Sequence, residues 1–392
     1  MRTLSIFGIA LISFARQGIA DIGCKCLPSE SCWPSKSEWT ALNESISGQL
    51  IESTPPAAAC YPSQPSYNPS ECDSILTAWT SSAFHAANPV SIDASIWANN
   101  ICNPIYPNGT SISGNTRAGV DGCSIGAYPV YVISVTEVSH IQAAFNFSSK
   151  HNLRLSIKNT GHKGAGRNTA FGSLSYVVSN NTTGIVAQKA VTIGAGVQDG
   201  ELFDTLLAQK AFAVGGANVD VGVVGWATGG GHGVMTGAHG QGADNIIEAS
   251  LVTPAGEILT ANEKQNTDIF WAIRGGGGGT FGVIFNMTLK AYPEPSLTTL
   301  ALNISGKTQP LPRFVPQAQD KGVHGYFTLG MNPKSLSGSL FAWNADNATV
   351  EAAILPLKQF LSKTASNGTI DYTLAPIPIS TVSDLLKLLP SV

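Results

Sequence analysis

The sequence predicts an α+β fold in two main domains. Apolar strands alternate with amphipathic helices from about residue 125 to 295, and two glycine-rich segments each follow a strand directly. Pro293 and Pro295 then mark a boundary. Residues 296–392 predict part of a second domain, of α/β type with an antiparallel sheet, and the chain stops a few residues into another expected helix.

The first 20 residues have the layout of a cleavable secretory signal. Arg2 precedes an apolar run at 4–14, and the small residues Gly18 and Ala20 lie near the expected cleavage point. The run is too short to span a bilayer. A buried N-terminal helix is the alternative, but Arg16 would interrupt its apolar face. We therefore expect a secreted, soluble protein, and no later stretch is apolar enough to predict a membrane anchor in the mature chain.

Residues 21–124 predict an irregular lead-in that is tied by disulfides. They are rich in Pro, Ser, Asn and Cys, show little periodicity, and contain all seven cysteines of the chain. Behind a secretory signal and without paired CxxC units, these cysteines favour disulfides, and no metal site is expected. An odd count leaves at least one thiol without an intrachain partner, and the pairing cannot be read from sequence. The cysteines are Cys24, Cys26, Cys32, Cys60, Cys72, Cys102 and Cys123.

The surface chemistry fits an exported protein and argues against a nucleic-acid partner. The net charge is -3 and the sequence pI is near 6.2, so no basic patch is expected. Acceptor triplets for N-glycosylation are frequent, although a chain rich in Ser and Thr produces some by chance. They begin at Asn43, Asn108, Asn146, Asn180, Asn181, Asn286, Asn303, Asn347 and Asn367.

The first strand, helix and strand begin at Val130. A short apolar strand at 130–133 runs into Ser134 to Glu137, whose spacing is that of a capping box and predicts the start of a helix. Apolar and polar residues then alternate at 153–157, which predicts a half-buried strand that ends in a loop. The expected buried positions are Val138, Ile141 and Phe145 in the helix, and Leu153, Leu155 and Ile157 in the strand.

A second block repeats the alternation. Strands are expected at 191–193 and 212–214, with a helix between them that carries Leu202, Phe203, Leu206 and Leu207 on one face. Residues 248–252 and 257–260 predict a hairpin around Pro254-Ala255-Gly256. Asp268 is expected to cap a short helix that ends at Arg274, and glycines lead from there into a long strand over 283–289. In the second domain, the pattern predicts strands near Tyr326, Leu340 and Tyr372 and a helix over 352–361.

The two glycine-rich segments, 159–166 and 215–233, indicate backbone that bends through positive φ or lies against a ligand. Loops that follow a strand can turn several N–H groups toward one point and hold a pyrophosphate, although tight turns in a β-rich protein are the alternative. Gly194 to Gly200 superficially matches a dinucleotide fingerprint, but its last spacing is one residue too long and no acid is convincingly placed for the ribose. Neither a Walker A sequence nor a GxSxG elbow occurs.

Several motifs in order carry a resemblance to a known family. In order and spacing they are similar to the fungal branch of the berberine-bridge-like FAD-linked oxidases, within the vanillyl-alcohol-oxidase superfamily. The resemblance spans about 125–295, and the lead-in from Cys24 to Pro34 also resembles that branch. The motifs are Ile157 to His162 continuing to Gly166-Arg167, then Gly215-Gly216 through Val221 to Gly233, then Gly242 to Asn245, and then Asp268 to Gly278 ending in Phe281-Gly282-Val283.

The resemblance implies a domain plan and a cofactor. Beside the signal at 1–20 and the Cys-rich lead-in at 21–124 expected from composition, it implies a two-lobed PCMH-type FAD-binding domain at 125–295 and a partial substrate domain at 296–392. His162 matches the histidine that bonds the 8α-methyl carbon of the flavin; as a lone loop histidine it would otherwise be an ordinary hydrogen-bonding residue. The other positions matched to cofactor binding are Lys158, Asn159, Thr160, Gly161, Gly164, Gly166 and Arg167 in the first loop, Gly216, Asn218, Gly222, Gly225, Gly229, Gly230 and Gly233 in the second, and Asp244 and Val283 beyond it.

Doubly tethered members of the family carry a cysteine where this chain has Asn218, so a single covalent bond is expected. In relatives, the catalytic base comes from the substrate domain and the end of the chain, and no base is assigned here. His232, Asp244 and Tyr128 are candidates for lining the flavin, with a structural role as the favoured alternative for each.

The resemblance implies a secreted oxidase that acts on a small organic molecule. Hydride would pass from substrate to flavin N5, and O2 would reoxidise the flavin. The expected substrate is a fungal secondary metabolite, and the enzyme is expected to be a monomer. A carbohydrate or alcohol oxidase on the same scaffold is the alternative within enzymes. A truncated and catalytically silent flavin-binding remnant, or a glycine-rich structural protein without ligand, are alternatives outside them.

Overall fold

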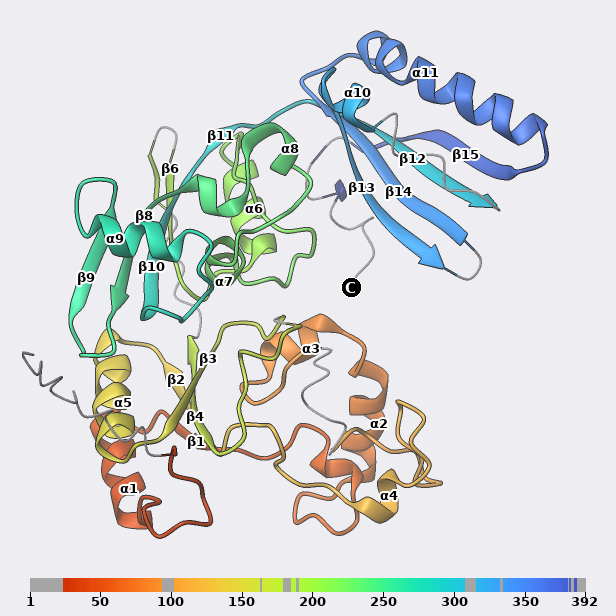
Figure 1. Ribbon diagram of the computed structural model, residues 1–392. Helices are drawn as coiled ribbons and strands as arrows, with labels where there is room; N and C mark the ends of the chain where they lie inside the picture. Colours follow the sequence, from red (N-terminus) through yellow and green to blue (C-terminus); the bar gives the residue numbers. More distant parts are fainter. Residues whose placement is uncertain are drawn as a thin grey trace, which may run out of the picture.

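The computed structural model describes residues 24–93, 102–162, 164–178, 185–187, 190–306, 315–331, 334–379, 381 and 384–385 (Figure 1). The expected signal at 1–20, the glycosylation triplets at Asn180 and Asn181 and the last residues of the chain lie outside these ranges. Within them, strands form three main sheets and a two-stranded pair, with helices packed around them. The predicted α+β class is confirmed.

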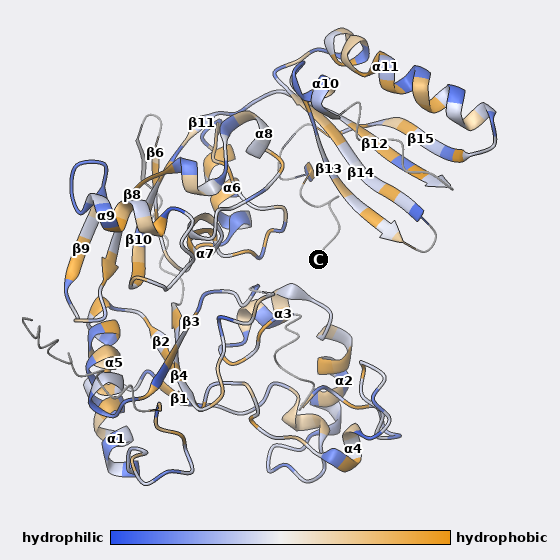
Figure 2. Cartoon of the chain, in the orientation of Figure 1, coloured by the Kyte–Doolittle hydropathy of each residue, from blue (hydrophilic) through white to orange (hydrophobic). Residues whose placement is uncertain are grey.

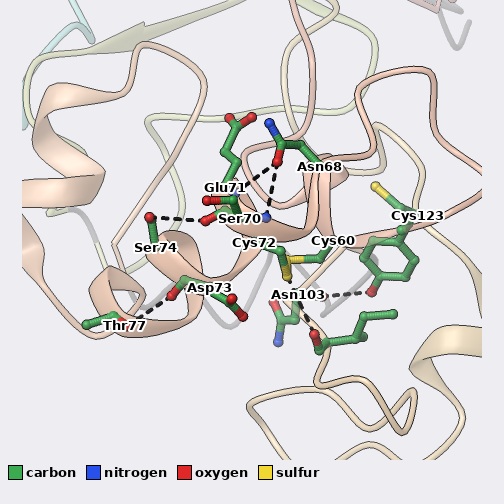
Figure 3. Close-up of a disulfide and its surroundings, with 12 residues drawn as sticks. Cys60, Asn68, Ser70, Glu71, Cys72, Asp73, Ser74, Thr77, Asn103 and Cys123 are labelled. Carbon is green, nitrogen blue, oxygen red and sulfur yellow. Dashed lines mark hydrogen bonds between the residues drawn. A yellow bond between two sulfur atoms is a disulfide. The ribbon is translucent and has the colours of Figure 1, made fainter.

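The lead-in is more regular than its composition predicts. Helix α1 begins with a capping box between Ser35 and Glu38, and α2 begins where the Asn68 side chain accepts hydrogen bonds from two backbone amides (Figure 3). Caps of this kind stabilise short helices that carry little apolar periodicity. The expectation of purely irregular structure was therefore wrong here. The elements are α1 (Lys36–Ser45), β1 (Leu50–Glu52), η1 (Ala58–Cys60), α2 (Pro69–Ala78), α3 (Ser82–Ala87) and α4 (Ala118–Asp121).

Three disulfides hold the lead-in together, as expected from the cysteine pattern. Figure 3 shows the bridge that joins η1 to α2, next to a buried apolar cluster. The seventh cysteine, Cys24, is exposed and outside any bridge. The pairs are Cys26–Cys32, Cys60–Cys72 and Cys102–Cys123.

The first main sheet has the strand order β1-β2-β4-β3, so the lead-in supplies one of its edges. Strands β2, β4 and β3 run parallel, and β1 pairs antiparallel with β2. Helix α5 packs against the sheet with Ile141 fully buried and Phe145 nearly so, which confirms the predicted apolar face. The elements are β2 (Tyr131–Val135), α5 (Val138–Lys150), β3 (Arg154–Lys158) and β4 (Ser173–Val178).

The predicted capping box at Ser134 is wrong. Ser134 lies inside β2, paired with Val177 of β4, and the helix starts only at Val138, after Glu137. Pairing with the neighbouring strand extends β2 through the residue that the local pattern assigned to the cap. Propensity signals of this size are routinely overridden by tertiary contacts.

Leu153, just before β3, is buried as predicted, but within β3 the burial pattern differs from the predicted alternation. Ser156 and Lys158 are buried, whereas Leu155 and Ile157 are only partly so. Ser156 lies against Ser173 of β4, and the Lys158 ammonium bonds to backbone carbonyls of the lead-in. Polar side chains are tolerated inside because each has a partner.

The second main sheet is antiparallel, with the order β5-β6-β10-β8-β9. The predicted hairpin of β8 and β9 and the long strand β10 are confirmed. Helix α9 begins at Thr267, after Asn266 in a left-handed conformation, so Asp268 lies inside the first turn and the prediction that it caps the helix is wrong. The elements are β5 (Ile185–Ala187), β6 (Ala190–Gly194), α6 (Asp199–Leu207), α7 (Val223–Thr228), α8 (Thr236–His239), η3 (Gly242–Asn245), β8 (Ile246–Val252), β9 (Ile258–Asn262), α9 (Thr267–Ile273) and β10 (Val283–Lys290).

A two-stranded pair joins this region to the rest of the chain. The predicted strand at 212–214 is shorter than expected: β7 (Ala211–Phe212) pairs with β11 (Tyr292–Pro293). Pro293 therefore ends a short edge strand, a position that proline tolerates. Phe212 is buried in a cluster that also includes Phe341 of the last sheet, so this pair lies beside the contact between the two regions.

The third main sheet is antiparallel with the order β13-β14-β12-β15. Figure 1 shows it at the upper right, with α10 and α11 on the same side of it, and α11 packs against it through buried residues such as Ile354 and Leu361. The predicted strands and helix are confirmed, with α11 longer than expected at both ends. The elements are β12 (Leu297–Gly306), α10 (Val315–Gln319), β13 (Val323–Met331), β14 (Lys334–Trp343), α11 (Asn347–Ser366) and β15 (Ile370–Ile377).

Apolar residues are spread in short runs over all three sheets and not gathered in one long helix (Figure 2). In the described part of the chain, no helix combines the length and the apolar character that crossing a bilayer requires.

Candidate functional site

The two predicted glycine-rich segments meet around one cavity. Its empty volume is about 890 Å³, part of it open to solvent. β3 and the loop after it form one wall, and α7, β10 and the turn before β10 form the others. The lining residues are Ile157, Asn159, Thr160, His162, Arg167, Asn168, Ala195, Val221, Gly222, Val224, Gly225, Trp226, Gly278, Gly279, Val283 and Ile284.

Glycine is required at the cavity wall because backbone and side chains approach closely. A Cβ atom at Gly222 would collide with the Asn159 amide, and one at Gly279 would collide with Ile157. At Gly225, by contrast, a Cβ would meet no protein atom within 4 Å. The cavity therefore leaves bare backbone facing a space that a ligand can enter, which is how glycine-rich loops approach phosphates.

Two hydrogen bonds connect the walls. The Gly222 amide donates to the Thr160 hydroxyl at 3.1 Å, which joins the first glycine-rich segment to the second. Arg167 donates to the hydroxyl of Thr280 at 2.6 Å, which ties the end of the first loop to the turn before β10. The guanidinium is the cationic group of the cavity lining within the described residues, and an arginine of this kind suits a phosphate ligand.

His162 is nearly enclosed at this cavity. Its Nδ1 lies 3.3 Å from a carboxylate oxygen of Asp93, and its Nε2 is buried with no hydrogen-bond partner among the described residues. Burial lowers the pKa of the imidazole below its usual value, and the carboxylates of Asp93 and Asp220 oppose that shift. A neutral imidazole with an unused nitrogen at the wall of a cavity is able to act as a nucleophile.

The lead-in contributes residues that the sequence analysis missed. The Ser82 hydroxyl, at the start of α3, donates to the Asp220 carboxylate at 2.7 Å, and the Asn218 amide lies 3.5 Å from the same hydroxyl. Asp93 contacts His162. Nothing in the irregular pattern of 21–124 marked these positions, because the contacts join residues far apart in sequence.

Lys158 lies away from the cavity. Its buried ammonium donates to the carbonyl oxygens of His85, Ala86 and Asn88 at 3.2, 3.4 and 2.8 Å. These carbonyls lie at the end of α3, where a cation also interacts favourably with the helix dipole. Burial lowers the pKa of Lys158 to about 8. These hydrogen bonds attach the lead-in to β3.

The predicted cofactor residues divide between the cavity and its surroundings. Asn159, Thr160, His162, Arg167, Gly222, Gly225 and Val283 line the cavity together. Several others form the turns behind it: the Gly216 amide donates to Asp199, the Gly233 amide donates to Thr236, and the Asp244 carboxylate accepts from the amide of Gln241. Outside the lining, among the described residues, are Lys158, Gly161, Gly164, Gly166, Gly216, Asn218, Gly229, Gly230, Gly233 and Asp244.

The two aromatic candidates, Tyr128 and His232, lie outside the cavity lining. Tyr128 is buried, and burial raises the pKa of its phenol to about 12. His232 lies 3.0 Å from the Tyr326 hydroxyl of β13, and its backbone carbonyl accepts a hydrogen bond from the indole of Trp226. Trp226 lines the cavity. His232 therefore links the cavity wall to the third sheet.

The fold, together with a cavity between two glycine-rich segments, defines a class: an FAD-binding protein of the PCMH type. Residues 129–262 match the family model described as "FAD binding domain". This match begins at the edge of β2 and ends with β9.

The relatives agree with that class. The FAD-linked oxidoreductase apf9 of Gibberella fujikuroi is 32% identical over 409 residues, covering 94% of this chain and 67% of the relative. The FAD-linked oxidoreductase ZEB1 of Gibberella zeae is 32% identical, covering 89% of this chain and 63% of the relative. The crystal structure of the VAO-type flavoprotein MtVAO615 from Myceliophthora thermophila superposes with a TM-score of 0.83 at 30% identity, covering 94% of this chain and 68% of that one.

The chain belongs to the FAD-linked oxidoreductases of the VAO type, the family to which its motifs are similar. The predicted family and its FAD cofactor are confirmed. The chain spans 63% and 61% of the length of two of these curated relatives.

Proposed function

We propose that the chain acts as a flavoprotein oxidase that removes a hydride from a small organic substrate and delivers the electrons to O2. One observation carries the proposal: the largely enclosed imidazole of His162 lies at the wall of a cavity where two glycine-rich segments meet through Thr160 and Gly222. Bound FAD supplies the two-electron acceptor in this chemistry. The family of the chain supports the same reaction class.

The residues at the cavity account for binding and orientation. Gly225 lets a ligand lie against the backbone of α7, and the Arg167 guanidinium offers charge to a pyrophosphate. Asn159 is held by a hydrogen bond to the carbonyl of Ala195, so the first loop keeps its position whether or not the ligand contacts it.

We infer a single covalent bond, between His162 and the flavin. Asn218 occupies the position of the second attachment in doubly tethered relatives, and a carboxamide cannot form a thioether. Its side chain is engaged instead, since its oxygen accepts a hydrogen bond from the Asp220 amide at 2.9 Å. Acid precipitation of the purified protein tests the bond. Flavin should stay with the pellet and, after digestion, with the peptide that contains His162 and not with the one that contains Asn218.

Secretion and the substrate class are part of the same proposal. Three disulfides and the predicted signal support export. The similarity of the motifs to the fungal branch of the family is the basis for a substrate of the secondary-metabolite type. Hydrogen peroxide release on a panel of alkaloids, polyketides, alcohols and oligosaccharides distinguishes an active oxidase from a silent flavin-binding protein. Colourless purified protein, or yellow pigment that leaves the acid pellet entirely, would contradict the covalent flavin.

A further inference from the structure

The contact between Asp93 and His162 is enclosed and doubly anchored. The carboxylate oxygen lies 3.3 Å from Nδ1, and the two side chains are only 11% and 17% exposed. The Asp93 amide also donates to the carbonyl of Gly161 at 3.2 Å. Asp93 is therefore bound both to the backbone beside His162 and to the imidazole itself.

The segment that carries Asp93 is held in place from the other side. Lys158 bonds to the carbonyls at the end of α3, and the buried His85 is linked to the Ser91 hydroxyl at 2.6 Å and to the Trp79 carbonyl at 2.7 Å. Lys158 lies at the end of β3 and His162 in the loop that follows it. The hydrogen bonds of Lys158 therefore hold this loop and the segment that carries Asp93 in fixed positions relative to each other. A carboxylate held this firmly can set the orientation of a ring, as second partners of functional histidines generally do.

We propose that Asp93 is a positioning residue for the covalent attachment of FAD to His162. It holds the imidazole in one orientation and stabilises the positive charge that the ring gains while one of its nitrogens bonds to carbon. The inference rests on the proposed covalent flavin. Asp93 comes from the lead-in, so the lead-in is a functional part of the cofactor site and more than a disulfide-tied support.

The attachment balances with O2 as oxidant. One nitrogen of His162 forms a bond to the 8α carbon, and that carbon loses a C–H bond. Two protons leave, one from the carbon and one from the imidazole N–H, and the Asp93 carboxylate is placed to accept the second. The two electrons pass to the flavin ring and then to O2, which takes up two protons to give H2O2. A negative charge beside the ring favours the step because the imidazole becomes cationic before its proton leaves.

Asp220 provides a matched control. It is a second carboxylate whose charge acts on His162, but its side chain bonds to Ser82 and the structure gives it no direct contact with the imidazole. If the surrounding negative field alone assisted attachment, Asp93→Asn and Asp220→Asn would have similar effects. If the direct contact matters, only the first would be strongly impaired.

The test measures the rate of covalent incorporation after FAD is added to full-length protein that was produced under riboflavin limitation. We expect Asp93→Asn to slow the appearance of acid-stable flavin by at least about 10-fold, while reversible FAD binding and Tm stay near wild type. Asp220→Asn should stay within about 3-fold of wild type, and Asp93→Glu, which keeps the charge, should be faster than Asp93→Asn.

Three results would overturn the inference. The first is a wild-type rate in Asp93→Asn, and the second is equal slowing in Asp93→Asn and Asp220→Asn. The third applies if Asp93→Asn does not fold: a folded Asp93→Ala that incorporates FAD covalently at the wild-type rate. Wild-type protein without acid-stable flavin is a separate outcome, because it contradicts the proposed covalent bond itself.

Discussion

The Gly222 amide donates a hydrogen bond to the Thr160 hydroxyl at 3.1 Å, across 62 residues of sequence. This contact joins the loop that carries His162 to the start of α7. Because the bond is buried, neither segment can shift without leaving a polar group unsatisfied. This contact maintains the shape of the cavity. Substitutions of Thr160 or Gly222 should therefore weaken the binding of the cofactor.

Thr160→Val should weaken both folding and cofactor binding. The substitution keeps the shape of the side chain but leaves the Gly222 amide buried without an acceptor, which costs about 1–3 kcal/mol. We expect a lower Tm and a weaker affinity for FAD, measured by thermal unfolding and by flavin fluorescence titration. Thr160→Ser retains the hydroxyl and is the control. Equal behaviour of the two variants would show that the hydrogen bond is unimportant.

Gly225→Ala should separate folding from cofactor binding. A Cβ at this position meets no protein atom within 4 Å, and alanine in a helix is more favourable than glycine by about 1 kcal/mol. The protein should therefore fold at least as well as the wild type. FAD affinity should fall by at least about 10-fold if the ligand fills the space beside Gly225, which corresponds to about 1.4 kcal/mol. Unchanged affinity would place the cofactor elsewhere.

Much of the cavity could be predicted from sequence, and the reason is local. Asn159 and Gly222 belong to contiguous motifs in which short loops follow strands, so residue order and glycine spacing already indicated a ligand. Asp93 and Ser82 could not be found in this way. They approach His162 and Asp220 only because the chain folds back, and no periodic pattern surrounds them.

The two wrong predictions of helix caps also share a physical cause. Ser134 and Asp268 satisfied local rules for helix caps, but in each case a neighbouring strand or residue took the position. Lys158 is a different case: its match to the cofactor loop stays a prediction, and the structure shows its ammonium bonded to three carbonyls of the lead-in. Local sequence patterns located each segment to within a few residues. They did not predict side-chain contacts between residues that are far apart in the sequence.

Cys24 should be the one reactive thiol of the native protein. All seven cysteines lie in described parts of the chain, and six are bridged while Cys24 is exposed. Titration of folded protein with a thiol reagent should give one equivalent, and Cys24→Ser should give none with no change in Tm. More than one equivalent in the native protein would mean that a bridge is incomplete.

Asp199 should make stability depend on pH. Its carboxyl group is fully buried: one oxygen accepts a hydrogen bond from the Gly216 amide at 3.0 Å, and the other has no partner among the described residues. Burial raises its pKa from 3.8 to about 8. The folded protein therefore keeps this proton between pH 4 and 8 while the unfolded chain releases it.

The sign of the effect follows from that difference. Since the folded state binds more protons in this interval, the contribution of Asp199 to stability is complete below pH 4 and is lost as pH rises toward 8. Asp199→Asn keeps the acceptor for Gly216 but cannot ionise. We expect the Tm of the wild type to fall relative to that of Asp199→Asn between pH 5 and 8, measured by thermal unfolding in matched buffers. If the Tm values of the two proteins change with pH in parallel, Asp199 does not hold its proton in the folded state between pH 5 and 8.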